Sequence, residues 1–201
     1  MIGPGDRARL AAGFAKLSPE SRYRRFFTAM PRLSDRTLDR LVATDGWNHV
    51  AIGAEVVSDD PAATEGLGVA HFIRLPETPD VAEVAIAVID ACQRQGLGHL
   101  LLRELVMAAR ERGIRRFRAT VLSENAPARA LLEDLADQFT THREESALVY
   151  EITLPDRPEE ELRSGILYRL LALAAGGLQF VFDTLGGRDE PPKSPHPRDG
   201  A

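Results

Sequence analysis

Cysteine is nearly absent from this sequence, because Cys92 is the only one among 201 residues. A single cysteine excludes an intramolecular disulfide framework and a cysteine-rich zinc site. Hydrophobic residues make up 44% of the chain and charged residues 27%, which is ordinary for a globular domain. A chain of this length and composition can bury its own core, as one domain with an appendage.

Lysine is almost as scarce, since Lys16 and Lys193 are the only lysines among 25 basic residues. The net charge of −5 gives no general attraction to nucleic acid, so no nucleic-acid partner is expected. Residues 1–20 contain no apolar run of the kind that a secretory signal needs. The apolar stretch at 170–182 is interrupted by Gln179 and falls short of the about 18 residues of a membrane span. We therefore expect a soluble, cytoplasmic protein.

The hydrophobic periodicity changes once along the chain, after Gly46. Before that glycine, apolar residues at helical spacing predict that helices fill the first 45 residues. After it we expect strands, with an amphipathic helix at 97–112 and a short helix at 126–136 among them. The nearly unbroken apolar run at 81–89 predicts a strand that is buried on both faces. The expected strands are 49–57, 67–75, 81–89, 115–122, 139–143 and 147–154.

These elements predict an α/β (α+β) fold with a mixed, mostly antiparallel sheet flanked by helices. Strands 81–89 and 115–122 are joined through a helix, so we expect a parallel pair with a right-handed connection. The domain is expected at residues 1–155, followed by a helical extension at 156–185 and a disordered tail at 186–201.

The helical extension carries an apolar stripe that needs a partner surface. Docking on its own domain is the first expectation. Homodimerisation through this helix is the second, and interfacial membrane contact, which the acidic balance nearby disfavours, is the third. The stripe consists of Leu162, Ile166, Leu170 and Leu173.

The strongest chemical signal is the loop between the strand at 81–89 and the helix at 97–112. Gln93, Gly96 and Gly98 lie at this turn into a helix N-terminus. Backbone N–H groups and the helix dipole attract an anion there, and glycine lets a phosphate approach the backbone. The same glycines also suit a plain tight turn, so the loop alone leaves both interpretations open.

Two other phosphate-binding motifs are excluded. The chain has no Gly-x-x-x-x-Gly-Lys-Ser/Thr segment, and therefore no Walker-type loop. A dinucleotide-binding fingerprint needs a third glycine three residues after Gly98, where Leu101 stands instead.

The motif Gln93-x-x-Gly96-x-Gly98 resembles the acyl-coenzyme A loop of the GNAT acetyltransferases. Residues 116–135 resemble the next strand and helix of that superfamily, with Asn125 at its asparagine. The segments 17–27, 33–41 and 82–102 are together similar to Pat-type bacterial protein lysine acetyltransferases and the stand-alone GNAT domains related to them. The resemblance covers about residues 5–154.

This resemblance implies an acetyl-CoA site built largely from backbone. Amides of residues 93–98 would hold the pyrophosphate, and the edge of strand 81–89 would pair with pantetheine. Strands 81–89 and 115–122 splay apart in this fold, and the acyl thioester enters that gap. Asn125 would hydrogen-bond the cofactor arm, although it equally fits a plain helix N-cap. The implied cofactor-binding residues are Ile86, Ala87, Val88, Gln93, Arg94, Gln95, Gly96, Leu97, Gly98, His99 and Asn125.

Glu83 is the candidate general base. An amine must lose a proton to attack a thioester, and a carboxylate near the gap suits that task. Glu83 stands in an otherwise apolar strand, where an unpaired carboxylate is costly, and the resemblance places the Pat-type catalytic glutamate there. The alternative is a structural ion pair with an arginine. The oxyanion would be held by a backbone N–H near Val88.

The sequence departs from the family pattern in three places. Many GNAT enzymes carry a tyrosine general acid in the helix after the asparagine, where this chain has Leu131 and Leu132. Ala136-Asp137 stands where a glycine and an aromatic residue often end that helix. We also expect no nucleotide-controlled regulatory domain before residue 5.

Other polar residues carry weaker signals. The histidines are scattered without ligand spacing, so no metal site is expected. Cys92 lies beside the expected cofactor loop, and we interpret it as a packing residue rather than an acyl-accepting nucleophile. We interpret Arg22, Arg24 and Arg25 as a solvated helix face, with the steering of an acidic cofactor or protein partner as the less favoured role.

The sequence as a whole predicts an acyl-CoA-dependent N-acetyltransferase that uses acetyl-CoA and no metal. Its acceptor is an amine, and a protein lysine is slightly preferred because of the Pat-type resemblance. One alternative is a small-molecule amine acetyltransferase. Another is a non-catalytic acyl-CoA-binding regulatory module, which the missing tyrosine favours and Glu83 disfavours.

Overall fold

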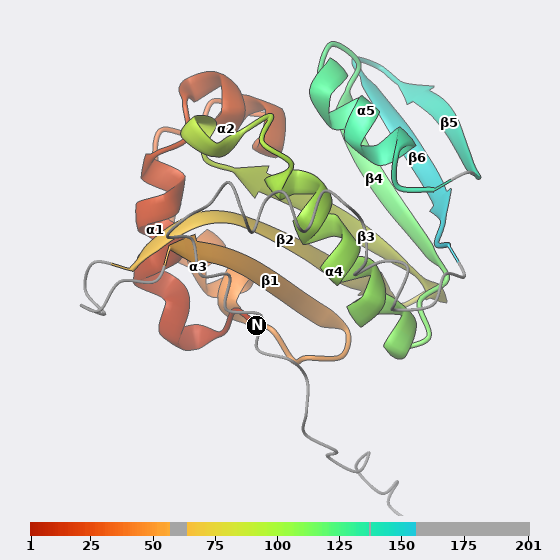
Figure 1. Ribbon diagram of the computed structural model, residues 1–201, viewed down its shortest axis with the longest axis horizontal. Coiled ribbons are helices and arrows are strands. Elements are labelled where there is room, and N and C mark those ends of the chain that lie inside the picture. The colour runs from red at the N-terminus through yellow and green to blue at the C-terminus, as the bar shows by residue number, and fades with distance from the viewer. Residues whose placement is uncertain (57–63, 137, 156–201) are drawn as a thin grey trace, which may run out of the picture.

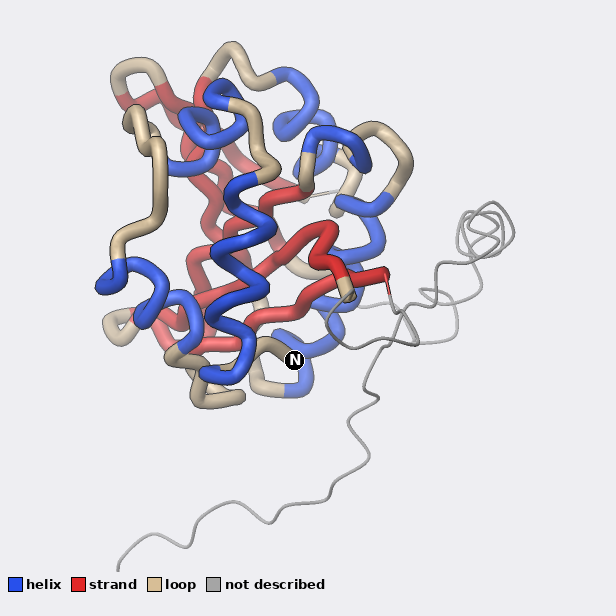
Figure 2. The backbone as a smooth tube through the Cα atoms, turned by 90° about the vertical axis from the view of Figure 1, so that its left-hand side faces the viewer, coloured by secondary structure: helices blue, strands red, loops and turns tan. Residues whose placement is uncertain are grey.

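The computed structural model of this chain describes residues 1–56, 64–136 and 138–155. The expected helical extension at 156–185 and the tail at 186–201 lie outside the described residues. Helices lie on both sides of a six-stranded sheet (Figures 1 and 2). Across the described ranges, no helix is both long and apolar enough to cross a membrane.

Short helices fill the N-terminal region, as the sequence predicts. They are η1 (Pro4–Asp6), α1 (Arg7–Ala15), α2 (Pro19–Phe26) and α3 (Asp35–Val42). Ser18 begins α2 because its hydroxyl accepts a hydrogen bond from the backbone N–H of Ser21 at 3.1 Å. Ser34 begins α3 in the same way.

The sheet is mixed and mostly antiparallel, which confirms the predicted fold class. Its strands lie in the order β1-β2-β3-β4-β6-β5, and only the β3–β4 pair is parallel. The strands are β1 (His49–Val56), β2 (Glu65–Leu75), β3 (Thr78–Val88), β4 (Arg116–Leu122), β5 (Phe139–Glu144) and β6 (Ala147–Thr153). The elements between them are η3 (Asp90–Cys92), α4 (Leu97–Glu111) and α5 (Ala126–Glu133).

The two faces of β1–β3 have different partners. Phe72 of β2 and its neighbour Val84 of β3 are buried in the core that Leu101 of α4 also joins. Alternate residues point to the opposite face, where His71 of β2 receives a hydrogen bond from Arg25 of α2. The sheet therefore separates α4 from the N-terminal helices.

Strands β3 and β4 pair over only a short segment. Their register joins Val81–Glu83 to Arg116–Arg118, and β3 then continues to Val88 beside β2 alone. Figure 1 shows β4, β6 and β5 grouped with α5 on the far side of this junction. The prediction that strand 81–89 is buried on both faces is wrong, because Glu83 is exposed and residues 85–88 are half-buried. The uncovered side of this strand borders a groove.

Candidate active site

A groove of about 1060 Å³ follows the open side of β3. Residues 83–88 of β3 and 119–121 of β4 line it, together with side chains from α2, α4 and α5. Every site residue expected from the sequence lies on this groove except Leu97. The Leu97 side chain is buried in the core, so only its backbone is available to a ligand.

The N-terminus of α4 forms one end of the groove. Gly96 precedes the helix with φ of 86°, a left-handed conformation that a side chain would strain. The first hydrogen bond within the helix runs from the backbone N–H of Leu100 to the Gly96 carbonyl. The N–H groups of Leu97, Gly98 and His99 therefore have no acceptor within the helix. These groups and the helix dipole fit the pyrophosphate of a coenzyme A molecule.

Gly98 also has a packing role. A Cβ at this position would lie 3.1 Å from Cδ2 of Leu131, which is closer than ordinary carbon contacts. The glycine therefore lets α4 approach α5 closely. A second contact joins the same helices, since Nε2 of His99 lies 3.3 Å from a carboxylate oxygen of Asp134.

Asp90 and Gln93 tie the cofactor loop to α2. The Asp90 carboxylate accepts hydrogen bonds from the Ser18 N–H (2.8 Å), the Ser18 hydroxyl (2.7 Å) and the Ser21 hydroxyl (2.9 Å). The Gln93 amide donates to the Ser21 hydroxyl and to the Val88 carbonyl. Burial raises the pKa of Asp90, but the bonds from Ser18 and Ser21 outweigh it and hold the pKa below its ordinary value. The loop, the end of β3 and the start of α2 thus form one connected unit.

Glu83 lines the groove from β3. It is exposed, and its side chain makes no hydrogen bond or ion pair with the described residues, although its charge acts on Arg25. Its neighbour on β4, Arg118, is instead bonded to Glu151 of β6 at 2.5 Å. The structural ion pair that was the alternative interpretation of Glu83 is therefore not formed within the described part of the chain.

The arginines of α2 are not one solvated face, and that prediction is wrong. Arg22 lies over the Phe14 ring, 4.7 Å from its centroid, and donates to two backbone carbonyls. Arg24 pairs with Glu20 one turn before it and also lines the groove. Each guanidinium thus has a partner fixed by the fold.

Arg25 differs most from a solvated arginine, because it is partly buried and bonded to another side chain. It is half-buried and lines the groove, and its Nη2 donates to Nε2 of His71 at 2.7 Å. Burial lowers the pKa of Arg25 to about 10, against the opposing charge of Glu83. Burial, with the charges of Arg25 and His49, lowers the pKa of His71 to about 3. A charged guanidinium is therefore held here by a neutral imidazole.

Asn125 caps α5. Its side-chain oxygen accepts a hydrogen bond from the Ala128 N–H at 3.3 Å, and the residue is buried at the edge of the groove. Leu131 and Leu132 of the same helix also line the groove. Among the described lining residues there is no tyrosine.

Cys92 packs against the core and does not line the groove. Burial raises the pKa of its thiol, which disfavours the thiolate that a nucleophile needs. This placement agrees with the packing role expected from the sequence. Within residues 1–56, 64–136 and 138–155, no three His, Cys, Asp or Glu side chains gather as metal ligands would.

Known acetyltransferases resemble this chain in sequence. Acetyltransferase Pat of Mycolicibacterium smegmatis is 31% identical over 132 residues, which are 66% of this chain and 38% of that protein. The chain thus spans well under half the length of this curated relative.

Solved structures share the fold. The crystal structure of the GNAT domain of S. lividans PAT is similar with a TM-score of 0.67 and 33% identity, covering 76% of this chain and 88% of that one. The structure of yncA from Salmonella typhimurium with its cofactor acetyl-CoA has a TM-score of 0.54 at 20% identity, covering 76% of this chain and 91% of that one.

The model of the acetyltransferase (GNAT) family matches residues 21–136, which hold α2, β3, the Gly96 loop and α5. That match covers more than half of the chain, and it includes both ends of the groove. The chain therefore belongs to the acetyltransferase (GNAT) family.

Proposed function

We propose that this acetyltransferase binds acetyl-CoA in the groove along β3 and transfers the acetyl group to a protein lysine. The unpaired carboxylate of Glu83, in a groove that begins at the N-terminus of α4, carries the proposal. The yncA complex supports the cofactor, and the similarity to Pat-type proteins supports the acceptor class.

The chain offers a continuous binding path for acetyl-CoA. The N–H groups of residues 97–99 bind the pyrophosphate, and the edge of β3 at residues 86–88 receives pantetheine as a neighbouring strand would. Gln93 keeps this edge in place through its bond to the Val88 carbonyl. The Asn125 amide borders the same path. When bound, the cofactor supplies an activated acetyl thioester.

Glu83 accepts the proton that the attacking amine must lose. A backbone N–H near Val88 stabilises the negative charge that develops on the thioester oxygen. Leu131 and Leu132 provide no acid for the leaving sulfur, so solvent protonates it. The same two leucines favour a second candidate, a non-catalytic acyl-CoA-binding module, which the assay below distinguishes.

The test uses acetyl-CoA labelled in its acetyl group, the purified protein and a lysate of the host. Label on protein bands, lost with Glu83→Gln, is the expected result. Glu124→Gln is the control, because Glu124 is an exposed carboxylate that does not line the groove.

The other results each change the conclusion. If the label appears only in the small-molecule fraction, the acceptor is a metabolite amine and not a protein lysine. Acetyl-CoA binding without any transfer makes the chain a binding module. Transfer that survives in Glu83→Gln contradicts the assigned base.

A further inference from the structure

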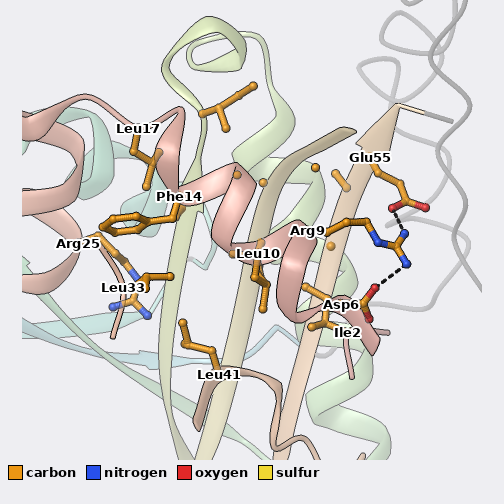
Figure 3. Close-up of a pocket in the computed structure, with 18 of the residues that line it drawn as sticks. Ile2, Asp6, Arg9, Leu10, Phe14, Leu17, Arg25, Leu33, Leu41 and Glu55 are labelled. Carbon is orange, nitrogen blue, oxygen red and sulfur yellow. Dashed lines mark hydrogen bonds and ion pairs between the residues drawn. The ribbon is translucent and has the colours of Figure 1, made fainter. Parts of the chain in front are cut away.

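A second cavity, of about 350 Å³, lies between the N-terminal helices and the sheet. Its lining is mostly apolar, with side chains such as Leu10 and Phe14 of α1 (Figure 3). At one end Arg9 is held between Asp6 and Glu55, at 2.8 Å from each carboxylate. Arg25 lies at the opposite end in the same view. Its guanidinium forms no ion pair with a carboxylate within the described residues, although the charge of Glu83 acts on it from the groove.

This cavity adjoins the groove. Leu17, Arg25 and Ala87 line both spaces, so these three side chains form a common wall. The cavity reaches β3 at Ala87 and touches Ile89 just after this strand, but it does not reach Glu83. It therefore borders the part of β3 assigned to the acyl donor. A group that enters it belongs to the donor rather than to the amine that meets Glu83.

Arg25 supplies a positive charge to this wall that no ion pair satisfies within the described residues, since Glu83 acts on it only by longer-range attraction. Its guanidinium donates to neutral His71 and lies 4.8 Å from the centroid of the Phe26 ring. No described carboxylate forms an ion pair with it, and Nδ1 of His71 is buried without a hydrogen-bond partner. A buried cation is costly unless an anion pairs with it, and a carboxylate matches the two parallel N–H groups of a guanidinium.

We propose that the wall between groove and cavity receives an acyl chain that ends in a carboxylate, of the succinyl or glutaryl type. Arg25 binds the terminal carboxylate, and the apolar cavity gives room for the methylene groups beside Ala87. The inference rests on the proposed function, since the chain arrives as a coenzyme A thioester. In the transfer, a C–N bond forms and the C–S bond breaks. The amine proton goes to Glu83, and the sulfur leaves as a thiolate that takes a proton from solvent.

The test compares the dissociation constants of succinyl-CoA and butyryl-CoA by calorimetry. Both acyl groups have four carbons, and they differ by a carboxylate in place of a methyl group. We expect about tenfold tighter binding of succinyl-CoA, the usual effect of one charge-assisted hydrogen-bonded pair. Arg25→Gln should remove this preference, and Arg25→Lys should keep part of it because it keeps the charge.

Arg24→Gln is the matched control. Arg24 is the next residue on α2 and also lines the groove, so its loss reports any general attraction between α2 and an anionic ligand. The ratio between the two dissociation constants should stay at its wild-type value in this variant. Acetyl-CoA affinity, measured on every variant, shows whether the groove is intact. The ratio of kcat/KM between the two donors should follow the same pattern.

Three results overturn the proposal. One is equal affinity of the wild type for succinyl-CoA and butyryl-CoA, and another is a preference that survives in Arg25→Gln. The third is free succinate that binds alongside acetyl-CoA, which would make the cavity a site for a separate acid. If acetyl transfer works and the preference is missing, only this inference fails. If acetyl-CoA does not bind at all, the proposed function fails with it.

Discussion

The first part of β3 pairs with β4, whereas its last part borders an open groove, although both parts consist mostly of apolar residues. Val81 and Ala82 are buried beside β4, whereas Ile86 and Val88 are half-buried beside the groove. The partner, rather than the residue type, makes the difference. An apolar run therefore predicts a strand, but it does not say whether protein or ligand covers that strand.

Two glutamates on one face of the sheet also differ in their partners. Glu151 and Glu83 both neighbour Arg118, through β6 and β3 respectively. Arg118 bonds Glu151, which leaves Glu83 free to act on a substrate.

Glu83→Gln should remove nearly all turnover. Loss of a general base costs about 10²- to 10⁴-fold in rate, while the binding path at the other end of the groove is unchanged. Steady-state kinetics and acetyl-CoA titration measure the two effects separately. An equal loss of affinity and rate would mean that Glu83 holds the cofactor instead. Glu124→Gln, at an exposed carboxylate outside the groove, should leave kcat within the error of the assay.

Gly96→Asp should abolish tight cofactor binding. The added carboxylate repels the pyrophosphate, and φ of 86° strains any residue with a Cβ. We expect the acetyl-CoA dissociation constant to rise by roughly 100-fold, the loss of one or two charge-assisted bonds. Calorimetry measures it, and circular dichroism confirms the fold. Unchanged affinity would remove the α4 N-terminus from the site.

Asp90→Ala should release α2 from the cofactor loop. The variant loses three hydrogen bonds to a carboxylate, and unfolding free energy should fall by about 2 kcal/mol in urea titrations at pH 7. The pKa of Asp90 is lowered, so its contribution is present above the ordinary aspartate value and fades as the pH falls below it. Glu124→Ala, at an exposed carboxylate, is the control. An equal loss at pH 3 would contradict the assigned bonds.

His71 should make the fold sensitive to acid. Its pKa is about 3 in the folded chain against 6.5 for an ordinary histidine, so between these values the unfolded chain binds a proton that the folded chain excludes. Stability should therefore fall as the pH drops from 6.5 towards 3, by at most about 1.4 kcal/mol per pH unit. His71→Gln should flatten that slope in urea titrations. Parallel curves for the two proteins would show that His71 titrates normally.

Gly13→Ala should stabilise the chain slightly. A Cβ on this α1 residue would meet only the Gly66 carbonyl oxygen, at an ordinary 3.8 Å. Alanine is favoured over glycine inside a helix by about 0.5–1 kcal/mol, which a thermal scan resolves. A lower melting temperature would mean that α1 packs more tightly on β2 than this distance indicates.

The sequence identified those parts of the site that depend on local signals. Gly96 and Gly98 mark a turn into an amphipathic helix, and Asn125 marks a helix start, so their positions follow from neighbouring residues. The order of strands and helices follows from periodicity in the same way, and the structure confirms it.

The parts that were missed depend on contacts between distant residues. Arg25 meets His71, 46 residues away, and Asp90 meets Ser18, 72 residues away. Three of the eight residues of α2 are arginines, which is typical of a solvated face, and only the packing of α2 on the sheet buries Arg25. The second cavity likewise exists only once α1 lies against β2 and α2 against β3.

A crystal structure of the complex with acetyl-CoA tests the central claim most directly. We expect the pyrophosphate to bind the N–H groups of residues 97–99 and pantetheine to lie along residues 86–88 of β3. The thioester should face Glu83. A cofactor bound outside the gap between β3 and β4, or a thioester directed away from Glu83, would contradict it.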